Sequence, residues 1–238
     1  MLIDKRNAIR APKIVRTAVV LCSILLVSAA FAPARAQTMT FEGLKDGEQI
    51  LNYYNGGLGN LGSGPGPNYG VVFGSSAVTY IESAHGGTGN FQNEPSPTTV
   101  TTFLSGGGAV MNVAGGFTTG LSFYYAAAVF PGVVTVYSGP NATGTVLATL
   151  TLPVTGDRCN GSIYDFSCWS PTGVAFSGVA QSVNFSGTVD AIGFDNITLG
   201  SASPLTAVPA LSVWGAVLLA ILLIVVAVRL LRAKPARA

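Results

Sequence analysis

Hydrophobic positions form one long continuous run near each end of the chain and only short segments between them. The second run, residues 205–228, holds 24 residues without a charge. As an α-helix rising ~1.5 Å per residue it would span roughly 36 Å, which exceeds the ~30 Å hydrocarbon core of a bilayer. The sequence therefore predicts a transmembrane helix. A buried core helix is the alternative, which the cations directly after the run disfavour.

Four cations follow this run, and the nearest preceding one is Arg158. By the positive-inside rule, the C-terminus lies in the cytoplasm and everything before residue 205 lies outside. The basic residues that flank the predicted helix are Arg229, Arg232, Lys234 and Arg237.

The first run, residues 17–31, has the layout of a secretory signal peptide. Five cations precede it, and Ala34-Arg35-Ala36 supplies small residues at the −3 and −1 positions of a cleavage site. We predict that residues 1–36 form a signal-peptide helix, handled by the Sec export machinery and removed between Ala36 and Gln37. An uncleaved N-terminal anchor is the alternative, which the shortness of the run disfavours.

Between the two runs, β-branched and aromatic residues occur in short segments separated by Gly, Pro, Asn and Ser. No apolar pattern of helical period appears. We therefore predict an all-β fold: a jelly-roll-like two-sheet sandwich over residues 37–200, flanked by the signal-peptide helix and the single transmembrane helix. A linker covers residues 201–207, and a C-terminal sorting and transmembrane segment covers 208–238. The predicted strands cover residues 38–44, 71–73, 77–81, 99–104, 109–113, 121–128, 133–137, 146–152, 174–176, 181–185 and 191–199.

Charge separates the ends of the chain from its middle. The whole chain has a formal net charge of +2, but residues 37–204 hold two cations against nine carboxylates, a net charge of −7. A negative domain disfavours nucleic acid and anionic lipid as partners, because both bind positive surfaces. Divalent cations and neutral glycans are compatible with it.

Two cysteines of this middle region, Cys159 and Cys168, lie close together in the sequence. In an oxidising exterior we predict that they form a disulfide, which would stabilise the fold by roughly 2–3 kcal/mol. Metal ligation is the alternative, but two thiols without a nearby histidine make a poor zinc site.

The C-terminal segment opens with Val208-Pro209-Ala210-Leu211-Ser212-Val213-Trp214-Gly215. This order of box, apolar helix and basic end resembles the PEP-CTERM sorting domains of Gram-negative surface proteins. It is most similar to the IPTL-CTERM variant, with Val208, Ala210 and Val213 in place of Ile, Thr and Glu. The other motif positions match: Pro209, Leu211, Ser212, Trp214 and Gly215.

The resemblance implies cleavage near this box by an exosortase-like transpeptidase. The protein would first be an inner-membrane-anchored intermediate with a periplasmic ectodomain and a cytoplasmic C-terminus. It would then pass to the cell surface or the extracellular matrix. A tail that is never cut is the alternative.

The predicted sandwich carries a resemblance of its own. Residues 40–44 (Thr-Phe-Glu-Gly-Leu) and 192–199 (Ile-Gly-Phe-Asp-Asn-Ile-Thr-Leu) look like the opening and closing of many PEP-CTERM-type ectodomains. The closing strand also resembles the last strand of carbohydrate-binding-module sandwiches. Several such modules hold a structural calcium through an early acidic residue and a late Asp, which map onto Glu42 and Asp195. Asp46 is a candidate by proximity, and solvated surface carboxylates are the alternative to a calcium site.

Few residues suit enzymatic chemistry. The single histidine, His85, lies in a loop and is expected at the surface, and Glu82 and Glu94 flank the same loop. These two are the only carboxylate pair suited to glycoside hydrolysis. No nucleophile elbow or phosphate-binding loop stands before a helix, so we predict a protein that is not an enzyme.

Aromatic residues in or beside predicted loops suit sugar rings, although aromatic residues of a sandwich more often belong to its core. We predict that Trp169 is at least partly buried near the disulfide. The candidates are Tyr53, Tyr54, Tyr69, Tyr80, Tyr164 and Trp169.

Three functions remain open from the sequence. The first is a non-enzymatic surface or matrix protein that contributes to biofilm or envelope material, with extracellular polysaccharide among its partners. The second is a specific glycan-binding module. The third is a secreted hydrolase that uses Glu82 and Glu94.

Overall fold

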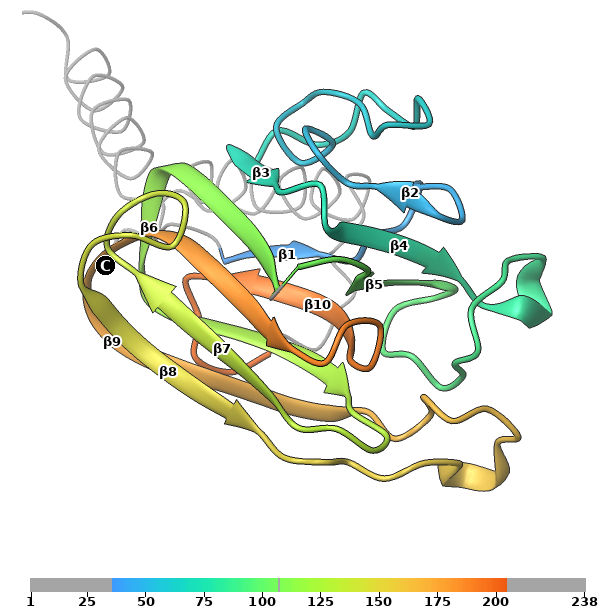
Figure 1. The fold of residues 1–238 in the computed structure, drawn as a ribbon. Coiled ribbons are helices and arrows are strands. Elements are labelled where there is room, and N and C mark those ends of the chain that lie inside the picture. Colours follow the sequence, from blue (N-terminus) through green and yellow to red (C-terminus); the bar gives the residue numbers. More distant parts are fainter. Residues whose placement is uncertain (1–35, 107, 205–238) are drawn as a thin grey trace, which may run out of the picture. The chain divides into compact units, whose positions relative to one another are not determined.

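The computed structural model describes residues 36–106 and 108–204 (Figure 1). These residues exclude the predicted sorting motif, the predicted transmembrane segment with its flanking cations, and all of the predicted signal peptide except Ala36. Among the residues described, none forms a helix with the length and hydropathy that a membrane span requires.

Within the described residues, ten strands form one hydrogen-bonded sheet in which all the strand pairs are antiparallel, and this confirms the predicted all-β class. Two short 3-10 helices accompany them, and the described residues contain no α-helix. The elements are β1 (Gln37–Met39), β2 (Glu48–Gln49), β3 (Val71–Phe73), β4 (Ala77–Ile81), η2 (Ser83–His85), β5 (Thr99–Phe103), β6 (Ala109–Ala126), β7 (Gly132–Tyr137), β8 (Val146–Leu152), η3 (Cys159–Gly161), β9 (Ser170–Gly187) and β10 (Gly193–Leu199).

The sheet runs in the order β2-β4-β5-β10-β6-β9-β7-β8, with β1 beside β10 and β3 beside β6. The long strands β6 and β9 belong to two layers, because both bend midway. The first part of β6 pairs with β3 and its last part with β10, whereas β9 pairs with β7 only over residues 182–187. The register shifts between residues 112 and 119, where Gly116 and Thr119 have positive φ angles of 69° and 73°. The sheet therefore folds over on itself (Figure 1).

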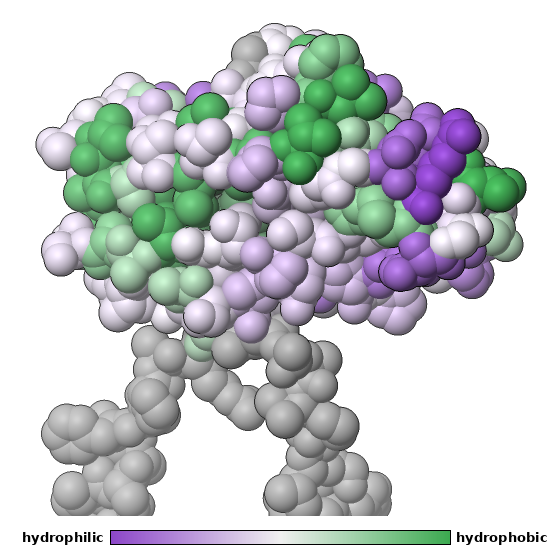
Figure 2. All heavy atoms as spheres, turned by 90° about the horizontal axis from the view of Figure 1, so that it is seen from below, coloured by the Kyte–Doolittle hydropathy of each residue, from purple (hydrophilic) through white to green (hydrophobic). Residues whose placement is uncertain are grey.

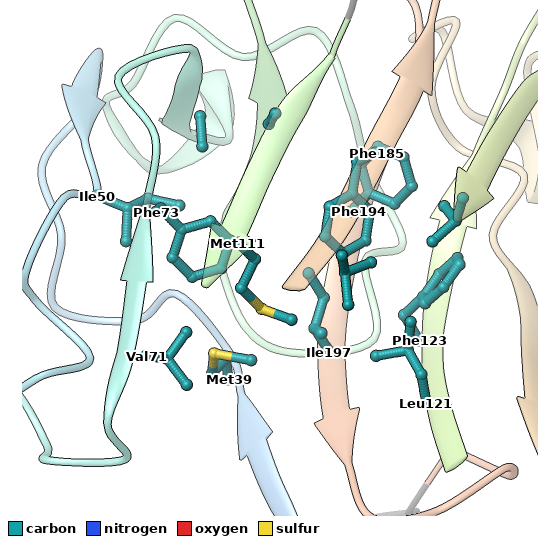
Figure 3. Packing of buried hydrophobic residues seen from close by; sticks show 14 of the residues in the cluster. Met39, Ile50, Val71, Phe73, Met111, Leu121, Phe123, Phe185, Phe194 and Ile197 are labelled. Carbon is teal, nitrogen blue, oxygen red and sulfur yellow. The ribbon is translucent and has the colours of Figure 1, made fainter. Parts of the chain in front are cut away.

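Aromatic side chains fill the space between the two layers. Phe123 and Phe194 come from one layer and Phe185 from the other, with ring centroids 5.1 to 5.9 Å apart (Figure 3). All three are at most 2% exposed. Burying each side chain contributes about 1.5–3 kcal/mol, and each edge-to-face pair adds about 0.5–1.5 kcal/mol.

Several predicted strand boundaries are wrong; the strands predicted over 174–176 and 181–185, for example, are parts of one strand, β9. The strand predicted over 38–44 ends at Met39, because Phe41 has a φ of 64° and the chain turns there. The strands predicted over 109–113 and 121–128 are the two halves of β6. The glycines between them lie in the bend of a continuous strand and do not end it.

Candidate functional site

A cleft of about 270 Å³ lies where β4, β5 and the start of β10 meet two loops. Its apolar lining includes the aromatic rings of Tyr80, Phe91, Phe166 and Trp169. Its exposed polar residues are Thr88, Asn90 and Asp190. The cleft thus combines flat apolar surfaces with hydrogen-bonding groups at its rim.

The loop over residues 86–93 forms one wall and is tied to the segment that follows η3. The N–H of Gln92 donates to the carbonyl of Phe166 at 3.2 Å, and the N–H of Phe166 donates to the carbonyl of Asn90 at 3.4 Å. The indole Nε1–H of Trp169 donates to the Gln92 carbonyl at 3.1 Å. These bonds fix the ring in the wall while part of it stays exposed, which confirms its predicted partial burial.

The predicted disulfide is confirmed and supports the same wall. Cys159 and Cys168 are bonded, with their Cα atoms 5.1 Å apart. The N–H of Cys159 also donates to the Ser167 hydroxyl at 2.8 Å. Because Trp169 directly follows the second cysteine, the covalent link restricts the backbone that carries the indole ring.

The cleft lining includes one carboxylate, that of Asp190. The chain turns at Asp190, whose φ is 56° and whose N–H donates to the Phe103 carbonyl at 2.8 Å. Burial raises the pKa of the Asp190 carboxyl. Burial also raises the pKa of the Tyr80 phenol, and the negative charges of Asp190 and Asp46 raise it further. A carboxylate and a phenol therefore both line the cleft.

Asp46, which the sequence offers as a possible calcium ligand by proximity, holds the cleft loop in place through hydrogen bonds. Its Oδ1 accepts hydrogen bonds from the N–H groups of Ile81 (2.9 Å) and Thr88 (3.1 Å). Its Oδ2 accepts a hydrogen bond from the Thr88 hydroxyl at 2.8 Å. This carboxylate links the turn before β2 to the end of β4 and the rim of the cleft.

The aromatic candidates from the sequence divide between core and cleft. Tyr53 and Tyr54 are buried, at 8% and 3% exposure. Tyr69 stacks on Tyr54 with an interplanar angle of 17°, and the hydroxyl of Tyr164 accepts a hydrogen bond from a serine of η2. The two remaining candidates, Tyr80 and Trp169, are the ones that line the cleft.

The two carboxylates proposed to bind calcium accept hydrogen bonds from the segment over residues 96–99. Asp195 is fully buried, and it accepts hydrogen bonds from the N–H (2.7 Å) and hydroxyl (2.7 Å) of Ser96 and from the N–H of Asn196 (2.6 Å). Glu42 accepts a hydrogen bond from the N–H of Thr99 at 3.0 Å. Burial raises the pKa of Asp195 to about 7 against the effect of these hydrogen bonds, and the charge of Glu42 adds to the increase.

These contacts fit hydrogen-bonded structural carboxylates better than metal ligands, because donors already occupy the oxygens of Asp195. Within residues 36–106 and 108–204, no three His, Cys, Asp or Glu residues are grouped so that they could hold a metal ion. Calcium at Glu42 and Asp195 stays a prediction. An equal melting temperature with and without a chelator, in both the wild type and Asp195→Ala, would contradict it.

The hydrolase candidates lie outside the cleft lining described above. Glu82 is 4% exposed, and its Oε2 lies 2.6 Å from Nδ1 of His85, whose side chain is mostly exposed as predicted. Glu94 accepts a hydrogen bond from the N–H of Thr98 at 3.0 Å. Burial raises the pKa of Glu94, and the negative charge of Glu82 raises it further.

Sequence reasoning overlooked the polar residues of the cleft. Asn90 lies in a Gly-Asn-Phe sequence, and Asp190 lies in the turn before β10. Both local sequences are typical of ordinary loops and turns. The single signal that could have pointed to Asp190 is its isolation. It is the first charged residue after Asp165, and it lies just before the strand predicted over 191–199.

The sequence matches no protein-family model and no curated protein. Among solved structures, the chain is similar to the K2 adhesin domain of Lys-gingipain, with 15% identity over 71% of this chain and 100% of that one and a TM-score of 0.43. It is also similar to a carbohydrate-binding module of Cellvibrio mixtus lichenase 5A solved with cellotriose, with 14% identity over 54% and 88% and a TM-score of 0.33.

A β-1,3-glucan-binding module from Bacillus halodurans gives 14% identity over 53% of this chain and 87% of that one, with a TM-score of 0.34. These TM-scores are low, so the similarities do not decide the function of this chain.

Proposed function

We propose that the chain is an exported, non-enzymatic glycan-binding protein of the cell surface or extracellular matrix, whose ligand site is the aromatic cleft. The observation that carries the proposal is the placement of Trp169 and Tyr80 beside Asn90 and Asp190 in one cleft. Aromatic faces stack on the apolar faces of sugar rings, while amide and carboxylate groups bind their hydroxyls.

The acidic rim narrows the ligand class. Asp190 lies exposed in the cleft, and Asp46 lies near enough to Tyr80 to influence its pKa. Two carboxylates at this side repel uronic acids and other anionic sugars. The proposed ligand is therefore a neutral polysaccharide.

The proposal that the protein is delivered to the surface depends on the two terminal signals in the sequence. We assign the folded sheet to the jelly-roll class, because its two layers are joined by long, bent strands. The surface role and the glycan-binding role are compatible, since a matrix protein can act by binding matrix polysaccharide. The hydrolase is the competing proposal. Loss of glycan hydrolysis in Glu82→Gln would favour it.

Affinity electrophoresis of the full chain in gels that contain a mixed-linkage β-glucan, a β-1,3-glucan or a xylan tests the binding proposal. We expect retardation by at least one of them and none by polygalacturonate. Trp169→Ala should weaken binding about tenfold or more, since the loss of one stacked ring removes about 1.4 kcal/mol. Phe130→Ala is the matched control, because Phe130 is 48% exposed and lies outside the cleft lining.

Asn90→Ala separates a binding role from a structural one. Its side chain is exposed, so the variant should fold as the wild type does and still bind the glycan more weakly. The proposal is contradicted if none of the three neutral polysaccharides retards the wild type. Equal retardation of the wild type, Trp169→Ala and Asn90→Ala would contradict the cleft assignment.

A further inference from the structure

The sheet ends on one side in a long edge strand that carries none of the usual protection against pairing. β8 bonds to β7 along one edge, and no described strand pairs with its other edge. Its sequence, Val-Leu-Ala-Thr-Leu-Thr-Leu, contains no charge, proline or glycine. Natural edge strands are commonly short, charged or interrupted by proline, because a free row of N–H and C=O groups recruits another strand.

The edge strand at the opposite end of the same sheet is protected against pairing with another strand. The edge strand there is β2, which is two residues long and includes the buried carboxylate of Glu48. The loop after it covers this strand through hydrogen bonds from the N–H groups of Leu61 and Ser63 to that carboxylate. The contrast indicates that the exposed edge of β8 is available for pairing.

Apolar side chains of β8 and of the first half of β9, which pack against the core, are also partly exposed to solvent. Leu147 and Leu150 of β8 and Val174 and Phe176 of the first half of β9 pack against the core but are only partly buried. Val146 is 52% exposed. Figure 2, which views the molecule from below Figure 1, shows hydrophobic surface at its left and again near its top, right of centre.

Charge selects the partner for this edge. Residues 95–156 contain no Asp, Glu, Lys or Arg, and neither do residues 166–189, which include all of β9. A charged partner such as a basic peptide, a nucleic acid or an anionic lipid finds no opposite charge here. A second copy of this chain brings an identical uncharged edge, so two copies meet without like-charge repulsion at the point of contact.

We infer that β8 pairs antiparallel with β8 of a second copy, which joins two sheets edge to edge about a two-fold axis near Thr149. In this register Val146 lies opposite Leu152 and Leu147 lies opposite Thr151. The interface is isologous, because the same patch serves both copies. The inference is independent of the glycan cleft, which lies among β4, β5 and β10.

Cysteine cross-linking of the full chain tests this pairing. Cys22, the third cysteine of the chain, lies in the predicted signal peptide and is replaced by Ser for this test. Thr149→Cys should then give a covalent dimer under mild oxidation, because residues opposite each other in antiparallel strands have Cβ atoms about 4.5–5.5 Å apart. Thr188→Cys is the matched control, since Thr188 is also an exposed threonine but lies in the loop between β9 and β10. It should stay monomeric.

Adding Thr151→Lys to the Thr149→Cys chain should lower the yield of covalent dimer at least tenfold, because it places two lysines in one pairing edge. Adding Thr188→Lys should leave the yield unchanged. The inference is overturned if Thr149→Cys and the double variant Leu147→Cys, Thr151→Cys, whose cysteines lie opposite each other in this register, both remain monomeric. It is also overturned if Thr151→Lys does not reduce the cross-link in a chain that keeps its native disulfide and melting temperature.

Discussion

Residues 40–94 and residues 95–156 differ in the interactions that hold their backbone in place. The first region holds five of the carboxylates and three short strands separated by loops, whereas the second holds no charge at all and includes β5, β6, β7 and β8. In the first region, buried carboxylates hold irregular backbone in place. In the second, strand pairing and apolar packing are sufficient.

Glu48 shows how the first region works. Its side chain is fully buried, and it accepts hydrogen bonds from the N–H groups of Lys45 (2.8 Å), Leu61 (2.9 Å) and Ser63 (3.0 Å). Gly59 lies so close that a Cβ there would be 2.4 Å from the carboxylate. A loop without regular structure has no neighbouring strand to accept hydrogen bonds from its N–H groups. One acidic side chain accepts several of them instead.

The largest effect should come from the aromatic core that joins the two layers. Phe123→Ala removes a fully buried ring that contacts Phe185 and Phe194, and it should lower the free energy of unfolding by about 3–5 kcal/mol. Urea denaturation measures the difference. Phe130→Ala, at a ring that is 48% exposed, should cost less than about 1 kcal/mol. Equal losses in the two variants would show that the layers are not held by this cluster.

In the carboxylate-rich region, Glu48→Gln should cost about 1.5–3 kcal/mol, because it replaces three charge-assisted hydrogen bonds with weaker or mismatched ones. Asp157→Asn removes an exposed carboxylate and should change the free energy of unfolding by less than about 0.5 kcal/mol. The loop around residues 58–63 should also lose protection in hydrogen exchange. If Glu48→Gln has the same free energy of unfolding and the same hydrogen-exchange protection as the wild type, the Glu48 carboxylate does not hold this loop in place.

Asp195 should make the stability depend on pH. Its pKa is raised from 3.8 to about 7 by burial, so between about pH 4 and pH 7 the folded state binds a proton that the unfolded chain has released. The contribution of Asp195 to stability is therefore full below about pH 4 and falls as the pH rises to about 7. The free energy of unfolding, measured by urea denaturation across this range, should lose this part of its slope in Asp195→Asn.

Glu42 lies near Asp195 and has its pKa raised by burial as well, so Glu42→Gln should remove part of the same slope. The assignment to Asp195 is wrong if the difference in stability between the wild type and Asp195→Asn is constant from pH 4 to pH 7.

The sequence predicts the strands in which apolar residues recur. It does not predict the polar contacts between distant parts of the chain. β7 and β8 appear almost residue for residue, because β-branched and aliphatic side chains dominate both. β2 was missed, because its Glu-Gln sequence shows no strand pattern and pairs only through tertiary contacts. The partners of Glu48 lie 13 and 15 residues further along a glycine-rich loop, where no local rule connects them.

The smallest effect concerns two neighbouring threonines of β5 at the border between the two regions. The Thr101 hydroxyl donates to the Val78 carbonyl at 3.0 Å, whereas the buried Thr102 hydroxyl has no hydrogen-bond partner among the described residues. Thr101→Val should therefore cost about 1 kcal/mol, while Thr102→Val removes an unsatisfied polar group and should be neutral or stabilising by up to about 1 kcal/mol. Both variants make the same change of side chain in the same strand, so the difference in melting temperature between them tests the difference in hydrogen bonding. A Thr102→Val protein that is destabilised as much as Thr101→Val would show that this hydroxyl is partnered in solution.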